Sequence, residues 1–256
     1  MNYLSTLRGE IIKIKRTSLL YFTFLAAVFT PAIMLLDNID GTPDKDFGLV
    51  DPYKAFYLGT FPFIAFILLP LFIVLITTLL IQIEYKSNTW KQVLASPQYL
   101  HSVLLSKFVV VQGLTILMLL IFNAFMIGVA AAIDYNYPQF SILNYLKSFD
   151  RLWYLNARTY IATFGMSALQ FWLALRFRNF IAPLGIGLVC CVMSPILLLE
   201  LKWENVMDKF PHALSIVVGV KQFEKIHVWA QWISVMYMVI FLVLAYLDFN
   251  RKTMKV

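Results

Sequence analysis

Six long runs of apolar residues limit what this chain can fold into. They cover residues 19 to 36, 58 to 83, 108 to 133, 159 to 175, 180 to 199 and 229 to 247. A transmembrane helix needs about 20 mostly apolar residues to cross the hydrocarbon core, so each run is near or above bilayer length. We therefore predict an all-α, polytopic membrane protein with six transmembrane helices, forming a single domain over residues 1–256.

The composition supports a membrane protein, because 61% of the residues are apolar and 14% are charged. Soluble domains have roughly 45–50% apolar and about 25% charged residues. The fourth run is the weakest of the six, since Arg158 and Arg176 bound it. A start nearer Leu152 is an alternative for that span.

The first eighteen residues are basic and have helical periodicity. Leu4, Leu7, Ile11 and Ile14 recur at spacings of three and four, and Arg and Lys residues lie mostly between them. This pattern predicts an amphipathic helix lying on the membrane surface over residues 1–18. The alternative is a charged leader without regular structure. No small-residue cleavage site follows the first apolar run, so we expect this segment to be retained.

The distribution of Lys and Arg predicts the orientation, since basic segments stay on the cytoplasmic side. With the N-terminus inside, the inner segments are 1–18, 84–107, 176–179 and 248–256. They have a net charge of +9, and the outer segments have a net charge of −2. Both termini are therefore expected in the cytoplasm. The basic residues are dispersed, which favours contact with anionic membrane lipids and not with nucleic acid.

Motifs for catalysis or metal binding are lacking in the sequence. The three histidines are scattered, the two cysteines are adjacent inside the fifth run, and the phosphate-binding motif GxxxxGK[ST] does not occur. The apolar runs also contain almost no ionisable residues, which enzymes and ion-coupled carriers of the membrane need at depth. We expect no catalytic site, metal or cofactor in this chain.

The segment from Glu84 to Lys107 is the most informative connection. Residues 89 to 95 are predicted to form a short cytoplasmic helix, and Ser96 with Pro97 then breaks it, because proline lacks an amide donor. Such a helix, held between two membrane helices, is suited to receive a soluble partner and to pass its movement to both membrane helices.

This segment resembles that of type-2 ATP-binding cassette permeases. In that family a glutamate closes the second span, a short coupling helix and a Ser-Pro break follow, and a lysine opens the third span. The matching residues are Glu84, Thr89, Trp90, Lys91, Ser96, Pro97 and Lys107. The sequence NTWK at residues 88–91 is most similar to the corresponding segment of the permeases of lantibiotic immunity and bacitracin-type peptide export. Many members have a glycine where this chain has Asn88, and asparagine tolerates the same left-handed backbone.

The resemblance implies a permease subunit of an ABC exporter in the bacterial cytoplasmic (inner) membrane. Its partners would be a cytoplasmic ATPase, which binds ATP and Mg, and a second permease chain, identical or related. The substrate would be an antimicrobial peptide or a lipid-like molecule. A noncatalytic scaffold subunit of another membrane complex is the alternative.

Simpler interpretations of the coupling residues remain open. Trp90 is also typical of an interfacial anchor, and Lys91 of a residue that only sets topology. Glu84 is harder to explain, because an acid at a helix C-terminus opposes the helix dipole and needs a cationic partner. We expect that partner to be Lys86, Lys91 or a basic N-terminal residue, in which case Glu84 ties the coupling segment to the surface helix.

Overall fold

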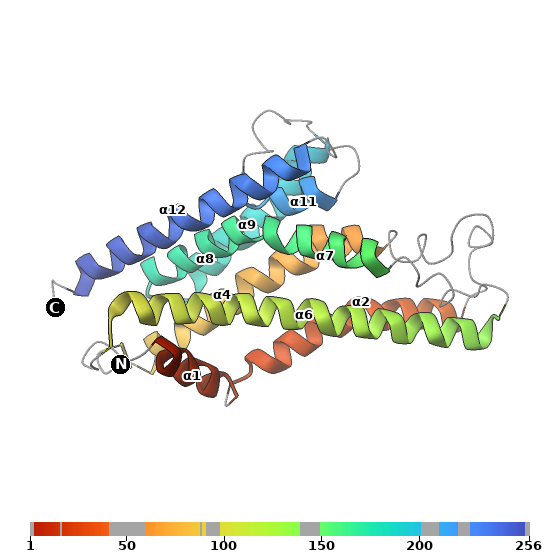
Figure 1. The fold of residues 1–256 in the computed structure, drawn as a ribbon, viewed down its shortest axis with the longest axis horizontal. Helices are drawn as coiled ribbons and strands as arrows, with labels where there is room; N and C mark the ends of the chain where they lie inside the picture. Colours follow the sequence, from red (N-terminus) through yellow and green to blue (C-terminus); the bar gives the residue numbers. More distant parts are fainter. Residues whose placement is uncertain are drawn as a thin grey trace.

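The chain is a bundle of long helices, as the computed structural model shows (Figure 1). The structure describes residues 3–15, 17–40, 60–87, 89–90, 98–138, 149–200, 210–219 and 226–253. Within these ranges every regular element is a helix. Helices suit a membrane interior because they satisfy all their backbone hydrogen bonds internally.

Within the described part of the chain, five helical segments are long and apolar enough to cross a membrane. The first is α2 (Leu19–Asp40), and the second runs over Thr60–Lys86 and includes the π-turn η2 (Ile64–Leu68) and α4 (Leu69–Lys86). The others are α6 (Leu100–Asn136), the segment of α9 (Ile181–Pro195) with the π-turn η4 (Ile196–Glu200), and α12 (His227–Thr253). These five correspond to five of the six predicted spans.

The predicted fourth span is divided between two helices, α7 (Phe149–Ala162) and α8 (Phe164–Arg176). Neither is long enough alone to count as a span. Ser234 of α12 lies at their junction, where its hydroxyl donates to the Ala162 carbonyl (2.9 Å) and accepts from the Gly165 amide (2.9 Å). A side chain of α12 thus replaces helical hydrogen bonds at the break. Helical structure begins at Phe149, before both the predicted start at residue 159 and the alternative start near Leu152.

A proline accounts for the π-turn of the second span. Pro70 has no amide hydrogen, so a regular turn around it would lose a hydrogen bond. The chain widens by one residue just before it, and the Leu69 amide bonds to the Ile64 carbonyl. The π-helix is rare, and where it occurs it is mostly a single turn of this kind inside an α-helix.

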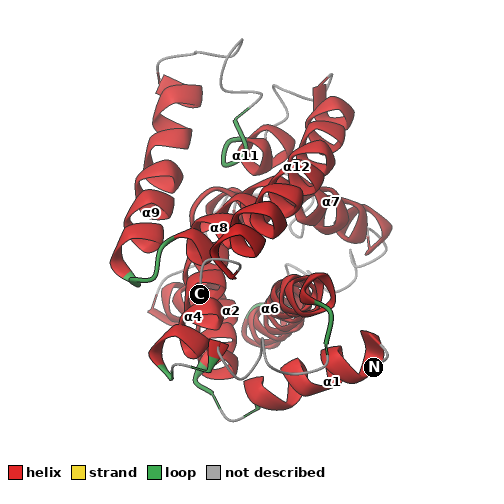
Figure 2. Cartoon of the chain, turned by 90° about the vertical axis from the view of Figure 1, so that its left-hand side faces the viewer, coloured by secondary structure: helices red, strands yellow, loops and turns green. Residues whose placement is uncertain are grey.

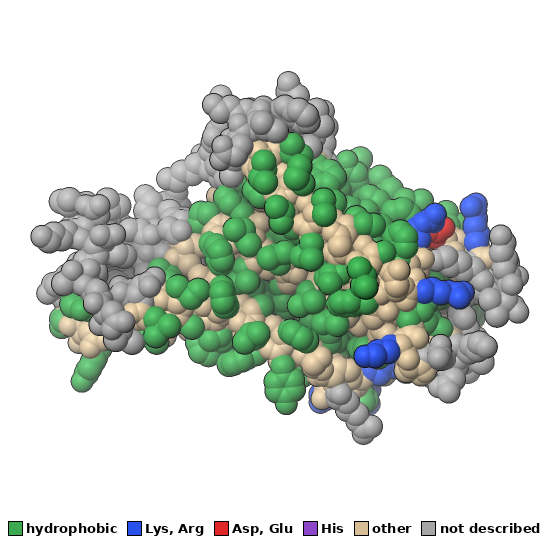
Figure 3. All heavy atoms as spheres, turned by 180° about the vertical axis from the view of Figure 1, so that it is seen from behind, with side chains coloured by type: hydrophobic (Ala, Val, Ile, Leu, Met, Phe, Trp, Pro, Cys, Tyr) green, Lys and Arg blue, Asp and Glu red, His purple; other side chains and the backbone are tan. Residues whose placement is uncertain are grey.

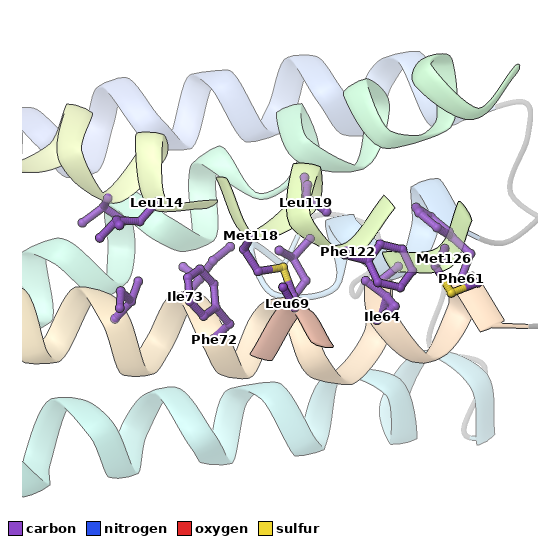
Figure 4. Close-up of a cluster of buried hydrophobic side chains, with 14 of the residues drawn as sticks. Phe61, Ile64, Leu69, Phe72, Ile73, Leu114, Met118, Leu119, Phe122 and Met126 are labelled. Carbon is purple, nitrogen blue, oxygen red and sulfur yellow. The ribbon is translucent and has the colours of Figure 1, made fainter. Parts of the chain in front are cut away.

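The largest core cluster lies between α6 and the second span. Figure 4 shows the interlocking side chains, which are Phe61, Ile64, Leu69, Phe72 and Ile73 on one side and Leu114, Met118, Leu119, Phe122 and Met126 on the other. Within a membrane such contacts hold helices together by close packing, since lipid tails are equally apolar. This cluster fixes the relative position of α4 and α6 near the candidate site.

Helix α1 (Tyr3–Ile14) packs against α6 at one end of the bundle (Figure 2). Its buried stripe is Thr6, Glu10 and Ile14, and not the whole apolar series expected from the sequence. Leu4 is 72% exposed, and Ile11 is exposed as well. A helix is therefore present over Tyr3–Ile14 of the predicted residues 1–18, with part of its apolar face directed away from the protein. Its position on the membrane surface stays a prediction.

Helix α1 and the last turns of α12 lie at the same end of the bundle (Figure 1). Seen from behind, Lys and Arg side chains gather at that end, and hydrophobic side chains cover the middle of the molecule (Figure 3). We call this end the basic end. It carries the candidate site described below.

Candidate functional site

Four charged side chains form a closed ring of ion pairs at the basic end. The Lys107 ammonium donates to Glu10 Oε2 (2.7 Å) and Glu84 Oε1 (2.6 Å). The Lys13 ammonium donates to Glu10 Oε1 (2.7 Å) and Glu84 Oε1 (2.9 Å). Each lysine thus contacts both glutamates, and the four formal charges cancel. We call these four residues the charge cluster.

The charge cluster is buried on one side and open on the other. The side chains of Lys107, Glu84 and Glu10 are 1%, 2% and 6% exposed, whereas that of Lys13 is 44% exposed. Charges this deep are tolerated only when they are paired and hydrogen-bonded. Lys13 is therefore the member that water, lipid headgroups or a partner can reach.

The pKa values of the two α1 residues follow from this arrangement. Burial by itself would raise the pKa of Glu10, but the attraction of Lys107 and Lys13 outweighs it and holds that pKa below its ordinary value. Burial would likewise lower the pKa of Lys13, but Glu10 and Glu84 outweigh it and raise that pKa. Both groups are held in their charged forms.

The cluster joins three helices that are distant in sequence. Glu10 and Lys13 lie one turn apart on α1, Glu84 lies in the last turns of α4, and Lys107 lies two turns into α6. Glu84 precedes the predicted coupling segment and Lys107 ends it. Both ends of that segment are therefore tied to α1 through the same ring of ion pairs.

Trp90 is anchored beside the cluster. The chain turns after α4 through a hydrogen bond from the Thr89 amide to the Glu84 carbonyl (3.1 Å). This turn places the Trp90 ring 4.6 Å from Phe249 of α12 and 5.6 Å from Tyr85, between ring centroids. The Lys107 ammonium lies 5.8 Å from the Trp90 ring centroid, within the range of a cation–π contact. Trp90 is only 8% exposed, so its ring packs against the protein.

The expected partner of Glu84 is partly confirmed. Of the three candidates, the basic N-terminal residue Lys13 binds Glu84, and Lys107 binds it from the other side. Thr89 is half-buried in the turn. Lys91, Ser96 and Pro97 lie outside the described residues, as does most of the predicted helix over residues 89 to 95.

Sequence reasoning missed Glu10 as a member of the site. Its signal is its position on the helix, since Thr6, Glu10 and Ile14 share one face of α1 at spacings of four. An acid on the stripe that faces the protein needs a buried cation, and Lys107 is that cation.

Two buried polar atoms of the site lack hydrogen bonds. Glu84 Oε2 and the indole nitrogen of Trp90 have no partner among the described residues. One is an acceptor and the other a donor, and both lie next to Lys107. Burying a polar group without a hydrogen bond costs free energy. These two atoms are therefore less favourably placed than the atoms of the ion-pair ring.

Comparison with known proteins shows the family. Residues 6–194 match the family described as "ABC-2 family transporter protein", which is well over half of the chain. The chain belongs to the ABC-2 transporter family. No curated protein matches the sequence.

The ABC-2 match covers α1 to α9 and therefore contains all four residues of the charge cluster. It identifies the protein as a multi-pass membrane permease of an ABC transporter. Among the described residues of this permease, no group of three or more His, Cys, Asp or Glu side chains is placed to hold a metal ion. Cys190 and Cys191 are free thiols on α9.

Proposed function

We propose that this chain is the membrane subunit of an ABC exporter and that the charge cluster couples it to a separate cytoplasmic ATPase. The partner hydrolyses ATP with Mg, and this chain supplies the path for an amphiphilic substrate, an antimicrobial peptide or a lipid-like molecule. Two permease chains, identical or related, pair in the bacterial inner membrane. The observation that carries the proposal is the buried ring of four charges at both ends of the coupling segment.

The ring supports coupling because it binds both ends of the coupling segment directly to the membrane helices. Residues 85 to 106 lie between two buried charges, Glu84 and Lys107, that share one ammonium–carboxylate contact of 2.6 Å. Separating such a pair leaves an uncompensated buried charge, which costs about 3–5 kcal/mol. A force on the segment is therefore passed to α1, α4 and α6 together.

Trp90 acts in this proposal as the anchor of the segment and not as an exposed docking contact. Its packing on Phe249 extends the connection to α12. The neighbouring Tyr85 hydroxyl adds a connection to α8, because it donates to the Leu175 carbonyl (2.8 Å). Lys91 and its neighbours then provide the surface that meets the ATPase.

The basic end supports the cytoplasmic placement of this site. Helix α1, the last turns of α12 and the gathered Lys and Arg side chains lie there (Figures 1 and 3). Basic segments resist translocation and are attracted to the anionic cytoplasmic leaflet. An ATPase needs cytoplasmic ATP, so the coupling segment belongs on this side.

The first test is to purify the tagged chain from its host in mild detergent and identify the proteins that accompany it. We expect a stoichiometric ATPase. The Lys91→Glu variant should lose it, and the Lys15→Glu variant, with the same charge change in the exposed turn just after α1, should retain it. Retention of the ATPase by the Lys91→Glu variant would move the docking surface away from the coupling segment.

The second test separates coupling from docking. Glu84→Gln removes one carboxylate charge from the ring and keeps its shape. We expect the ATPase to stay bound and substrate transport per ATP hydrolysed to fall at least tenfold. Unchanged assembly and unchanged ATP-driven transport would remove the coupling role of Glu84.

A scaffold subunit of another membrane complex is the competing function. A scaffold would purify with other membrane subunits and without an ATPase. The family membership favours the transporter, and the substrate class rests on the resemblance of the NTWK segment alone.

A further inference from the structure

The side chain of Gln170 bridges three helices inside the bundle. It lies on α8 and is 0% exposed. Its amide nitrogen donates to the Thr78 hydroxyl of α4 (2.9 Å) and to the Pro183 carbonyl of α9 (2.9 Å). A buried amide in a membrane protein needs such partners, because desolvation without them is costly. One side chain therefore fastens the beginning of α9 to both α4 and α8.

A glycine makes this contact possible. A Cβ atom on Gly187 of α9 would lie 2.6 Å from Gln170 Oε1 and 2.6 Å from a methyl group of Val74 on α4. Both distances are too short for real carbon contacts. The absent side chain thus lets α9 approach α4 closely enough for the amide to reach Pro183, one turn earlier.

One face of helix α9 packs against α4, α8 and the π-turn η2. Much of its surface faces outward, with exposed side chains that include Ile181, Val189 and Val192, and it stands at the edge of the bundle in Figure 2. Among the described residues, no other side-chain hydrogen bond joins α9 to another helix; the bond of Ser194 stays within α9. The start of α9 is capped locally by Asn179, whose Oδ1 accepts from the Ala182 amide (3.0 Å), and Gln170 supplies the described side-chain hydrogen bond that ties it to other helices.

The contact is also poised for release. Gln170 Oε1 is buried and has no hydrogen-bond partner among the described residues. An unpaired acceptor makes the closed arrangement less favourable than a fully bonded one, so separating the helices costs less. Hydrogen bonds between membrane helices are individually weak, which suits a contact that forms and breaks repeatedly.

We infer that the hydrogen bonds of Gln170, which packs against Gly187, hold α9 to α4 and α8 and break when the transporter changes state. This inference rests on the proposed function, in which the permease cycles between conformations. It assigns Gln170 a positioning role for α9 and no contact with the substrate.

The native cysteines of α9 provide the test. In a Cys190→Ser background, Cys191 is the remaining cysteine, and it is buried one turn beyond Gly187. Gln170→Met keeps an unbranched side chain of similar length but removes both hydrogen bonds. We expect N-ethylmaleimide to label Cys191 about five to ten times faster in this variant than in the parent, in detergent.

Gln112→Met is the matched control. The Gln112 amide donates to the Ser167 hydroxyl (2.7 Å) and joins α6 to α8, with no bond to α9. It should leave the labelling rate of Cys191 unchanged. An equal increase in both variants would mean general loosening of the bundle and would overturn the inference.

Gly187→Ala gives a second test that keeps Gln170 intact. The added methyl group must displace the amide or Val74, so Cys191 labelling should again rise. If Gln170→Met and Gly187→Ala both leave the labelling rate of Cys191 unchanged in monodisperse protein, Gln170 does not hold α9 in place.

The cycle itself is tested in the complex with the captured ATPase. ATP with orthovanadate, which traps ATPases after hydrolysis, should raise the labelling of Cys191 in the parent, and no change would overturn release during the cycle. Failure to capture an ATPase would count against the proposed function. The detergent comparison of Gln170→Met with Gln112→Met would still decide whether Gln170 holds α9.

Discussion

At the scale of single residues, Lys107 is the centre of the charge cluster. Its ammonium is 1% exposed and contacts two carboxylates, so its charge is compensated twice within the protein. An unpaired charge at this depth would be strongly unfavourable. The pairing explains why a lysine is stable in the first turns of α6, directly before a long apolar run.

Removal of this ammonium should be strongly destabilising. Lys107→Met keeps the length of the side chain but leaves Glu10 and Glu84 with Lys13 as their one cation in the ring. We expect a loss of about 3–5 kcal/mol, because an uncompensated buried charge remains. The measurement is the thermal unfolding midpoint in detergent. Lys15→Met, at an exposed position of the same end, is the control and should change the midpoint little. Equal midpoints for the two variants would contradict a stabilising ring.

The α1 residues predict how pH affects the docking of this helix. The folded pKa of Glu10 lies below its ordinary value of 4.5, so its contribution is present above pH 4.5 and is lost as the pH falls through the folded value. The folded pKa of Lys13 lies above 10.5, so its contribution is present below pH 10.5 and is lost as the pH rises through the folded value. Docking of α1 should therefore be insensitive to pH between these limits.

A dye on α1 measures this directly. Gly9 has open space around its Cα, so Gly9→Cys accepts a fluorescent label without disturbing the packing. We expect a flat signal from pH 5 to 10 and a change below pH 4.5. In a Glu10→Gln background the acid transition should shrink or disappear. An unaltered acid transition in that background would mean that another carboxylate controls the docking.

The sequence was sufficient to predict Glu84 as a tie between the coupling segment and the surface helix, since an acid at a helix C-terminus needs a cation. It was insufficient for Glu10. A single acid among Arg and Lys in an amphipathic segment has the pattern of a solvated residue, and its burial depends on α6, which is distant in sequence. Trp90 shows the same limit, because its burial depends on Phe249 near the C-terminus.

At the scale of helices, the break between α7 and α8 results from tertiary contacts. Run length predicted one span over residues 159 to 175, but Ser234 enters the junction from α12. Gly165 permits this approach, since a Cβ there would lie 2.9 Å from the Cβ of Tyr237. Hydropathy cannot reveal a hydroxyl from another helix, so the span was predicted and its break was not.

Ser234→Ala should weaken this junction. The substitution removes the hydroxyl that serves both the Ala162 carbonyl and the Gly165 amide, and leaves both backbone groups buried without it. We expect a loss of about 1–3 kcal/mol, seen as a lower thermal unfolding midpoint. Ser106→Ala is a suitable control, because the hydroxyl of Ser106 bonds within its own helix, to the Ser102 carbonyl. A larger effect in the control than in Ser234→Ala would contradict the role of Ser234 at the break.

At the scale of the whole molecule, helix length and charge distribution together predict the orientation in the membrane. Helix α6 has 37 residues and, at 1.5 Å per residue, is about 55 Å long, well beyond the roughly 30 Å of a bilayer core. Both of its ends therefore extend past the hydrocarbon. Its first end lies at the basic end of the molecule with α1 and the last turns of α12 (Figure 1). The Lys and Arg counts predict that this end is cytoplasmic, because the positive-inside rule depends on loops and not on packing.

Opposite ends of the bundle should consequently label from opposite sides of the membrane. Ser87, at the basic end, and Asn136, at the far end of α6, are both exposed. With Cys190 and Cys191 replaced by serine, we expect a membrane-impermeant maleimide to label Asn136→Cys in intact cells and Ser87→Cys only after the cells are opened. The reverse pattern would place the coupling segment outside, away from ATP, and would contradict both the orientation and the proposed coupling. Labelling of both sites from outside would mean that α6 does not cross the membrane, because a span of this length must separate its two ends.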